Sequence, residues 1–250
     1  MLKAIISILK LPINAFLSLL PFKARIFLSS TDTSIRFSAT VEQIEALAGN
    51  RKRISVLDVG GGSGLLSDYL DSRFRITVLD TNDEALQVAR KKGLHTIRAN
   101  GCEIPFKDNS FDLGVSIASL QYVPQPQRKK FLDEMKRVAS RGVVLYTPVD
   151  TATAVEHQVH NFRQGLHIPD PWLEQELALG LPSASQMQVS FKGARIISLQ
   201  SLSVWKKLMI AESIPLLNLF IPGILYRALW KSQESKQPFL GRIVVWRKDL

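Results

Sequence analysis

The chain contains a single cysteine, Cys102, among its 250 residues. One thiol excludes an internal disulfide and a metal cluster held by several cysteines, and it fits a reducing, cytoplasmic setting. The four histidines lack the paired spacing of a zinc site, so we predict no bound metal. Internal repeats and low-complexity segments are also lacking. What remains is a globular chain whose 46% of apolar residues is ample for one core.

Acidic residues are scarce at the two ends of the chain. The net charge of +10 consists of a basic surplus of five in residues 1–53 and another five in residues 205–250, while residues 54–204 are neutral. A basic surplus favours nucleic acid or an anionic membrane surface as a partner. Because both ends are also strongly apolar and lack the interleaved aromatic and basic residues that stack on bases, we predict no nucleic-acid partner.

Residues 2–20 form an amphipathic pattern with an unusually wide apolar side. Their polar residues recur at spacings of three and four, which places them in one narrow stripe on a helix. Lys10 and Pro12 argue against a clean membrane span, and no small-residue cleavage site of a secretory signal follows. An interfacial helix on a membrane is one interpretation, a cap over a ligand cleft is another, and an anchor is a third.

A glycine-rich turn follows the first apolar strand pattern. Residues 56–64 read Val-Leu-Asp-Val-Gly-Gly-Gly-Ser-Gly, and the next apolar run, 76–79, ends on Asp80. This arrangement is typical of the front half of a nucleotide-binding α/β unit. The glycines occupy the first, third and fifth turn positions rather than the first, third and sixth of a dinucleotide site. Asp58 would repel a pyrophosphate, so the turn favours a nucleoside that carries positive charge.

The downstream sequence strengthens this interpretation. Ile104-Pro105-Phe106 is followed by Asp108-Asn109-Ser110-Phe111-Asp112 and then by Arg137-Val138. Together with the turn and Asp80, these runs resemble the class I S-adenosylmethionine-dependent methyltransferases, and among them the small-molecule (type 11) subgroup. The resemblance covers roughly residues 52–148.

The resemblance implies a cofactor, S-adenosyl-L-methionine, and the residues that hold it. Asp58 would hold its amino-acid end, and Asp80 would accept from both ribose hydroxyls. The full implied set is Asp58, Gly60, Gly62, Gly64, Asp80, Thr81, Asn100, Gly101, Cys102, Ser116 and Ser119. Two positions depart from the family pattern: Asn100 replaces the usual acid that meets the adenine, and Gln121-Tyr122 stands where Glu-His is common.

The strand and helix patterns alternate as they do in a doubly wound α/β fold. We predict a Rossmann-like, mostly parallel seven-stranded sheet with an antiparallel last strand and helices on both faces. The expected strands are 54–59, 75–80, 94–98, 111–117 and 142–147, closed by an antiparallel pair at 195–199 and 242–246; the expected helices are 63–71, 82–92 and 126–139. This methyltransferase domain, 51–250, would follow a helical cap of apolar and basic residues, 1–50.

Beyond the fifth strand, residues 149–192 form a substrate-side segment. A histidine, Trp172 and a Gly-Leu-Pro run there resemble a segment that covers the substrate pocket in some bacterial type 11 proteins. His157 and His160 would share one helix face and are our candidates for a catalytic general base. Tyr122, Asp150 and His167 are weaker candidates, and a nitrogen or stabilised-carbon acceptor would need only positioning.

Residues 200–240 separate the two closing strands by far more than a hairpin needs, so they form an apolar insertion. Its aromatic and basic flanks at 205–231, together with residues 1–22, would suit the surface of an anionic membrane. We therefore predict a cytoplasmic methyltransferase for a small-molecule or lipid-like acceptor, with peripheral contact to the inner membrane surface as one option. The alternatives are a methyltransferase for a soluble sugar or polysaccharide precursor, with the apolar ends as a lid, and a cofactor-binding partner subunit without catalysis.

Overall fold

The computed structural model describes residues 31–214 and 236–248. Seven strands form one sheet in the order β3-β2-β1-β4-β5-β7-β6. Strands β1 to β5 pair in parallel, and β7 runs antiparallel to both β5 and β6. The predicted Rossmann-like sheet is therefore confirmed. The strands are β1 Ile54–Val59, β2 Phe74–Asp80, β3 His95–Arg98, β4 Phe111–Ile117, β5 Ala139–Pro148, β6 Arg195–Ser201 and β7 Phe239–Arg247.

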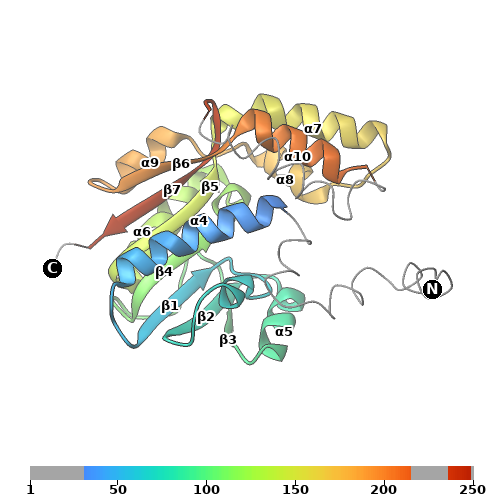
Figure 1. Cartoon of the computed structure of the whole chain (residues 1–250). Coiled ribbons are helices and arrows are strands. Elements are labelled where there is room, and N and C mark those ends of the chain that lie inside the picture. The colour runs from blue at the N-terminus through green and yellow to red at the C-terminus, as the bar shows by residue number, and fades with distance from the viewer. Residues whose placement is uncertain (1–30, 215–235, 249–250) are drawn as a thin grey trace, which may run out of the picture.

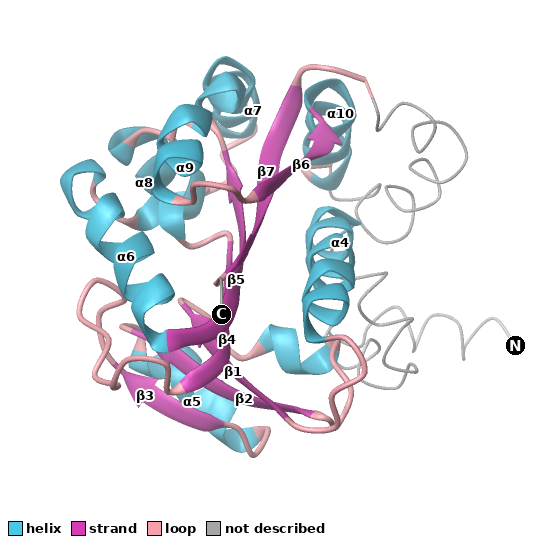
Figure 2. Cartoon of the chain, turned by 90° about the vertical axis from the view of Figure 1, so that its left-hand side faces the viewer, coloured by secondary structure: helices cyan, strands magenta, loops and turns pink. Residues whose placement is uncertain are grey.

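Helices cover both faces of this sheet, as Figure 2 shows with α4 (Thr31–Ala48) on one side and α6 (Arg128–Val138) on the other. The strands are apolar on both faces because alternate residues point to opposite helices. Along β1, Val56 packs in the core of the α4 face and Leu57 in the core of the α6 face. Both side chains are fully buried.

The prediction of a helix at 63–71 is wrong, because only the short 3-10 helix η1 (Leu65–Asp68) forms there. It starts directly after Gly64, whose φ of 69° is left-handed and breaks a regular helical start. The Ser67 hydroxyl also donates to the Gly64 carbonyl over 2.7 Å, which competes with α-helical hydrogen bonding. The expected helix at 82–92 is confirmed as α5 (Asp83–Lys91), with Asn82 as its N-cap.

The remaining helices all come after β4 in the chain, and α7, α8 and α10 lie together at the top of Figure 1. They are α7 Thr153–Gly165, α8 Pro171–Leu179, α9 Ala184–Ser190 and α10 Leu202–Glu212, accompanied by the short 3-10 helices η2 Leu120–Tyr122, η3 Gln125–Gln127 and η4 Asp150–Ala152. Val159 of α7, Leu173 of α8 and Leu208 of α10 share one buried cluster. Helices α7, α8 and α10 thus roof the sheet, whereas α9 packs against α6.

The apolar ends are described only in part. The predicted helix at 2–20 and residues 215–235 of the insertion lie outside the described residues. Among the described residues, Trp205 and Leu208 of α10 are buried against α7 and α8. The first residues of the 205–231 segment therefore belong to the core rather than to the surface. No helix in the described ranges has the length and apolarity to cross a membrane. The domain boundary at residue 50 stays a prediction, although α4 already packs on the sheet.

Candidate functional site

The glycine turn after β1 makes a concave backbone surface. Gly60, Gly62 and Gly64 all have positive φ, at 72°, 52° and 69°. A Cβ atom on Gly60 would lie 2.5 Å from the Ser119 side chain, so only glycine fits between the turn and the end of β4. Beside Gly62 a Cβ would fill open space in front of Asp80, where its nearest neighbour is 3.9 Å away. This is the space that a ligand of the turn would need.

Asp80, the last residue of β2, is held in place by two backbone amides. Its Oδ2 accepts from the Gly62 N–H at 2.8 Å, and its Oδ1 accepts from the Asn82 N–H at 2.9 Å. Each carboxylate oxygen keeps lone-pair capacity for a further donor. The carboxylate is therefore presented to the cavity in one orientation, as bidentate recognition of two hydroxyls requires.

A cavity of about 620 Å³ opens at the carboxyl ends of β1, β2 and β4. This is where the chain order of the sheet reverses, the usual ligand position in doubly wound folds. Seven of the eleven predicted cofactor residues line it: Gly60, Gly62, Asp80, Thr81, Asn100, Gly101 and Ser119. The structure thus brings together four segments that are separated in the sequence, namely the glycine turn, the end of β2, the turn after β3 and the end of β4.

The other four predicted cofactor residues lie behind this lining. Ser116 is fully buried in β4, and Gly64 packs tightly against Leu94. The Cys102 side chain is buried, and burial raises the pKa of its thiol, as expected for a structural rather than a nucleophilic cysteine. These residues shape the wall of the cavity.

Asp58 is the fourth predicted cofactor residue behind the lining, and it is a buried carboxyl group with a raised pKa. Its side chain is only 3% exposed and lies directly under Gly61, where any Cβ atom would collide with the carboxylate. Burial, helped by the negative charge of Asp80, raises the pKa of Asp58 to about 7. A positive charge bound at the turn would favour the ionised form of this carboxyl group.

Asn100 and Gly101 form another part of the cavity wall. The Asn100 side-chain oxygen accepts from the Cys102 N–H at 2.9 Å, which closes a tight turn after β3. Gly101 packs under the ring of Phe131, which lines the cavity and leaves no room for a Cβ atom. The turn therefore presents an amide side chain and a flat apolar ring side by side.

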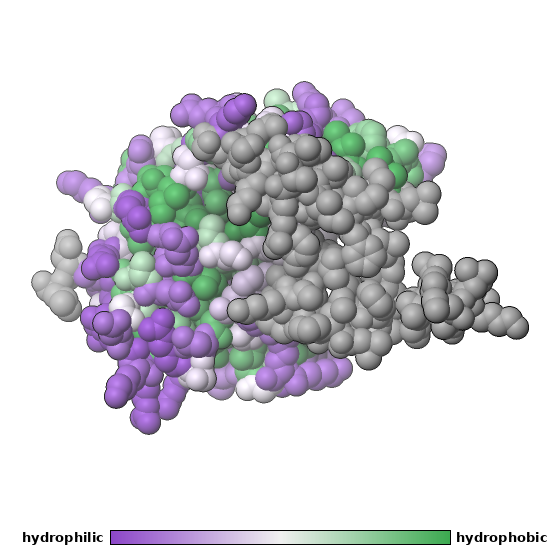
Figure 3. All heavy atoms as spheres, viewed as in Figure 1, coloured by the Kyte–Doolittle hydropathy of each residue, from purple (hydrophilic) through white to green (hydrophobic). Residues whose placement is uncertain are grey.

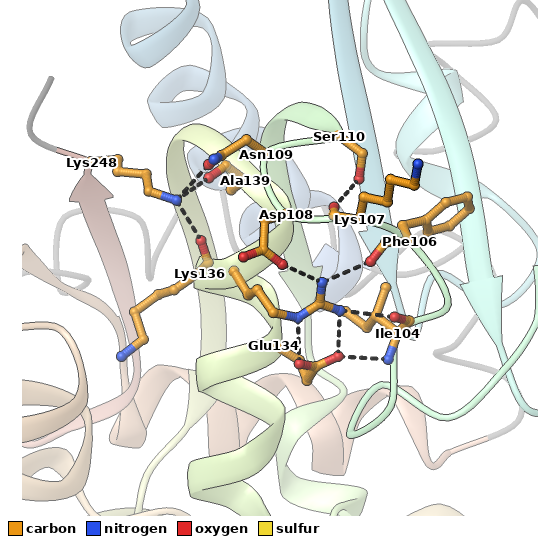
Figure 4. A network of polar contacts seen from close by, with 11 residues as sticks. Ile104, Phe106, Lys107, Asp108, Asn109, Ser110, Glu134, Lys136, Ala139 and Lys248 are labelled. Carbon is orange, nitrogen blue, oxygen red and sulfur yellow. Dashed lines mark hydrogen bonds and ion pairs between the residues drawn. The ribbon is translucent and has the colours of Figure 1, made fainter.

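The motif residues after this turn serve to anchor it, as Figure 4 shows. Arg137 of α6 donates to the carbonyls of Ile104 and Phe106 at 2.9 and 2.7 Å and forms ion pairs with Glu134 and Asp108. Glu134 in turn accepts from the Ile104 N–H at 2.8 Å. Arg137 thus ties the loop that follows Asn100–Cys102 to helix α6, which explains the spacing of these residues in the sequence.

The far end of the cavity lies beyond Ser119, whose hydroxyl donates to the Gly60 carbonyl at 2.9 Å. There the lining turns aromatic and apolar with Tyr122, Val123 and Trp172. The Tyr122 and Trp172 rings meet edge to face with centroids 5.8 Å apart, and Trp172 is 62% exposed. Trp172 was expected here from the segment resemblance, whereas Gln175, which also lines the cavity, gave no signal in the sequence.

The two candidate histidines do not line this cavity. His157 is exposed on α7, and His160 is half-buried, with a buried Nδ1 that has no hydrogen-bond partner in the described ranges. The face of α7 that points inward carries Glu156 and Val159 instead. Asp150 and His167 are exposed, so Tyr122 is the one candidate base residue that lines the cavity.

The comparisons with known proteins agree with this geometry. Residues 57–147, just over a third of the chain, match the family model described as a methyltransferase domain. A solved phosphoethanolamine N-methyltransferase of Haemonchus contortus, bound to S-adenosylhomocysteine, has the same fold with a TM-score of 0.59 at 15% identity. That likeness covers 85% of this chain and 53% of the other.

Three curated relatives match over part of their length. An uncharacterized protein of Methanocaldococcus jannaschii is 32% identical over 40% of this chain and 46% of its own. A rice 2-methyl-6-phytyl-1,4-hydroquinone methyltransferase is 34% identical over 36% of this chain and 29% of its own. A phosphatidylethanolamine N-methyltransferase of Cereibacter sphaeroides is 34% identical over 35% of this chain and 46% of its own. The chain thus spans less than half the length of these relatives.

The matched segment contains the glycine turn and Asp80 and spans the five parallel strands, whose carboxyl ends supply most of the cavity lining. Residues 57–147 therefore match a methyltransferase domain, and the described residues have the Rossmann-like fold of that solved methyltransferase.

Proposed function

We propose that this protein transfers the methyl group of S-adenosylmethionine to a small, lipid-like acceptor. One observation carries the proposal, namely that one cavity has a polar end and an apolar end. The polar end, here called the cradle, is lined by Gly60, Gly62, Asp80, Asn100 and Gly101. The aromatic and apolar end, here called the mouth, is lined by Tyr122, Val123 and Trp172. Such a cavity can hold the cofactor at one end and present an apolar acceptor at the other.

The cradle supplies binding and orientation. S-adenosylmethionine would bring a methyl group on a positively charged sulfur, and the chain has to align the acceptor with it and exclude water. In this proposal Asp80 holds the ribose, Asn100 and Gly101 meet the adenine, and the backbone of Gly60 and Gly62 follows the ligand closely. Asp58 stabilises the cationic end by becoming ionised beneath the turn.

The mouth supplies selectivity for an apolar acceptor. Trp172 and Leu166, which are 62% and 46% exposed, are large apolar side chains on or beside the helices that roof the cavity. Figure 3 shows further hydrophobic surface on the described part of the face that carries α4, near α10 and around β6 and β7. Two of the relatives are named for a prenylated hydroquinone and a phospholipid, which supports an acceptor with an apolar tail.

Contact with a membrane surface belongs to the same proposal. The support for it is the apolar and basic sequence of residues 1–22 and 215–231, since residues 205–214 pack inside. A peripheral position at the inner face of a membrane would give the mouth access to acceptors dissolved in lipid.

Transfer of tritium from labelled S-adenosylmethionine into a cell extract, separated into organic and aqueous phases, tests the proposal. We expect counts in the organic phase, and we expect Asp80→Ala to abolish them while Asp83→Ala, at an exposed ion pair on α5, retains them. Counts confined to the aqueous phase would contradict a lipid-like acceptor and favour a soluble sugar. Tight cofactor binding without any transfer would favour a partner subunit without catalysis.

A further inference from the structure

Two glutamates are buried together next to the mouth of the cavity. Glu156 of α7 and Glu176 of α8 are 1% and 8% exposed, and neither forms an ion pair within the described part of the chain. The Glu156 Oε2 atom is buried and has no hydrogen-bond partner among the described residues. An unpaired carboxylate in such a place is strongly destabilising, so these positions call for a reason beyond packing.

Most cations near this carboxyl pair (Glu156 and Glu176) are already engaged elsewhere. Arg36 of α4 pairs with Asp32 at 3.2 Å, and Arg163 of α7 pairs with Asp170. Arg36 still lowers the pKa of Glu176, while Asp32 and Asp170 raise it. Arg36 does not have this effect on Glu156, whose pKa is raised by burial and by the charge of Glu176.

Other polar groups around the pair do not neutralise it. Tyr146 of β5 donates its hydroxyl to Gln200 at 3.0 Å, and Glu212 of α10 accepts from the Thr31 N–H at 3.3 Å. His160, one turn along α7 from Glu156, has a buried Nδ1 without a partner. Burial is the main cause that raises the pKa of both glutamates, and their mutual repulsion adds to it, so the pair retains one proton near neutral pH. Because Arg36 favours ionised Glu176, that proton resides on Glu156.

Tyr122 connects the carboxyl pair to the cavity. Its ring lines the mouth, and its hydroxyl donates to Glu176 Oε2 over 3.4 Å. Burial, together with the nearby Glu176 charge, raises the pKa of Tyr122, so its hydroxyl stays protonated. A protonated hydroxyl between a substrate and a carboxylate can pass a proton on without becoming charged itself.

We propose that Tyr122 takes the proton from a hydroxyl group of the methyl acceptor and passes its own proton to Glu176, with Glu156 as the protonated member of the pair. This inference rests on the proposed function and narrows the acceptor to one that carries a hydroxyl. The acceptor oxygen bonds the methyl carbon as the carbon–sulfur bond breaks, and that electron pair stays on sulfur. The acceptor proton moves to the Tyr122 oxygen while the Tyr122 proton moves to Glu176 Oε2, so atoms and charges balance.

The first test needs no substrate. Infrared difference spectroscopy of the full-length protein at neutral pH should show a protonated carboxyl group that Glu156→Gln removes. Glu174→Gln, an exposed position on the same helix as Glu176, is the matched control and should leave the signal in place. A protonated-carboxyl signal that Glu156→Gln leaves unchanged, or a wild-type spectrum without any such signal at neutral pH, would overturn the assignment of the proton to Glu156.

The second test is the pH profile of label transfer from tritiated S-adenosylmethionine to an organic extract. Glu176→Gln and Tyr122→Phe should each slow transfer about 100-fold and remove the fall in rate at low pH, as expected for loss of a general base. Their affinity for S-adenosylhomocysteine should stay within twofold of wild type, because neither change touches the cradle. Both variants keep the shape of the side chain, so the fold should survive.

The outcomes separate the two proposals. If the wild type transfers label and Glu176→Gln keeps both the rate and its fall at low pH, the proposed proton transfer through Tyr122 to Glu176 (the relay) is wrong. The methyltransferase function then stands. If the wild type transfers no label to any extract, the proposed function fails and the relay falls with it.

Discussion

Replacing Asp80 should weaken cofactor binding more than the loss of a single hydrogen bond would, even when the replacement is isosteric. Both Asp80 oxygens face backbone N–H donors, from Gly62 at 2.8 Å and from Asn82 at 2.9 Å. An asparagine at this position must point its NH₂ group at one of these donors. Asp80→Asn therefore disturbs the turn as well as the ribose contact.

The magnitude follows from the hydrogen bonds to a charged group. Each such bond contributes about 1.5–3 kcal/mol, and about 1.4 kcal/mol corresponds to a tenfold change in affinity. Loss of one ribose bond alone would weaken binding roughly 10- to 150-fold. We expect Asp80→Ala and Asp80→Asn both to fall within or beyond this range.

Calorimetric titration with S-adenosylhomocysteine measures this directly. Asp83→Asn is the matched control, because its exposed carboxylate lies three residues further on and contacts Arg90 at 3.1 Å and Gln87 at 3.2 Å on its own helix, so its affinity should stay within twofold of wild type. An Asp80→Asn variant that binds within threefold of wild type would refute the ribose assignment, provided that its melting temperature is unchanged.

Three further predictions follow from the same region. Gly60→Ala should lower cofactor affinity at least tenfold in calorimetry, because its Cβ would lie 2.5 Å from Ser119. Gly93→Ala is the control for backbone strain alone, because Gly93 has a φ of +80° and a Cβ there would meet no described atom within 4 Å. For Asp58, the folded-state pKa of about 7 lies above the reference value of 3.8, so its contribution to stability is present below pH 4 and is lost as pH rises through 7. The unfolding free energy of Asp58→Asn should therefore rise relative to that of the wild type between pH 5 and 8, by up to about 4 kcal/mol. Denaturant titrations at a series of pH values measure this difference, and a difference that does not change with pH would contradict the burial argument. Arg137→Met should lower the unfolding free energy by roughly 2 kcal/mol and weaken cofactor binding through the Ile104–Phe106 loop, whereas Lys129→Met at an exposed pair on the same helix should change neither.

Local sequence patterns were enough to predict the cofactor half of the molecule. The glycine turn and the carboxylate at the end of the next strand are set by backbone conformation and by strand length, which neighbouring residues largely control. Parallel strands then bring their carboxyl ends to one edge, so Asp80, Asn100 and Ser119 meet without further information. The helix expected at 63–71 failed because the left-handed Gly64 and the Ser67 side chain compete with helical hydrogen bonds there.

The acceptor side was harder to predict because its residues meet only through packing. Tyr122 and Glu176 are 54 positions apart in the chain, and no local pattern indicates that their side chains touch. On α7 we predicted His157 and His160 as candidate bases rather than Glu156, because a glutamate normally lies on the exposed face of a helix. The structure instead buries Glu156 beside Val159 and leaves His157 exposed.

The sequence by itself therefore determined the sheet, the turn and the chemistry of the cradle, because these depend on the conformation of consecutive residues. Only the tertiary structure decided which charged groups lose their water. Asp58 is buried because β1 lies between β2 and β4 in the sheet, and Glu156 and Glu176 are buried under the helical roof, so both depend on contacts between distant elements. Desolvation and mutual repulsion, which raise the pKa values of these carboxyl groups, exist only once those contacts have formed.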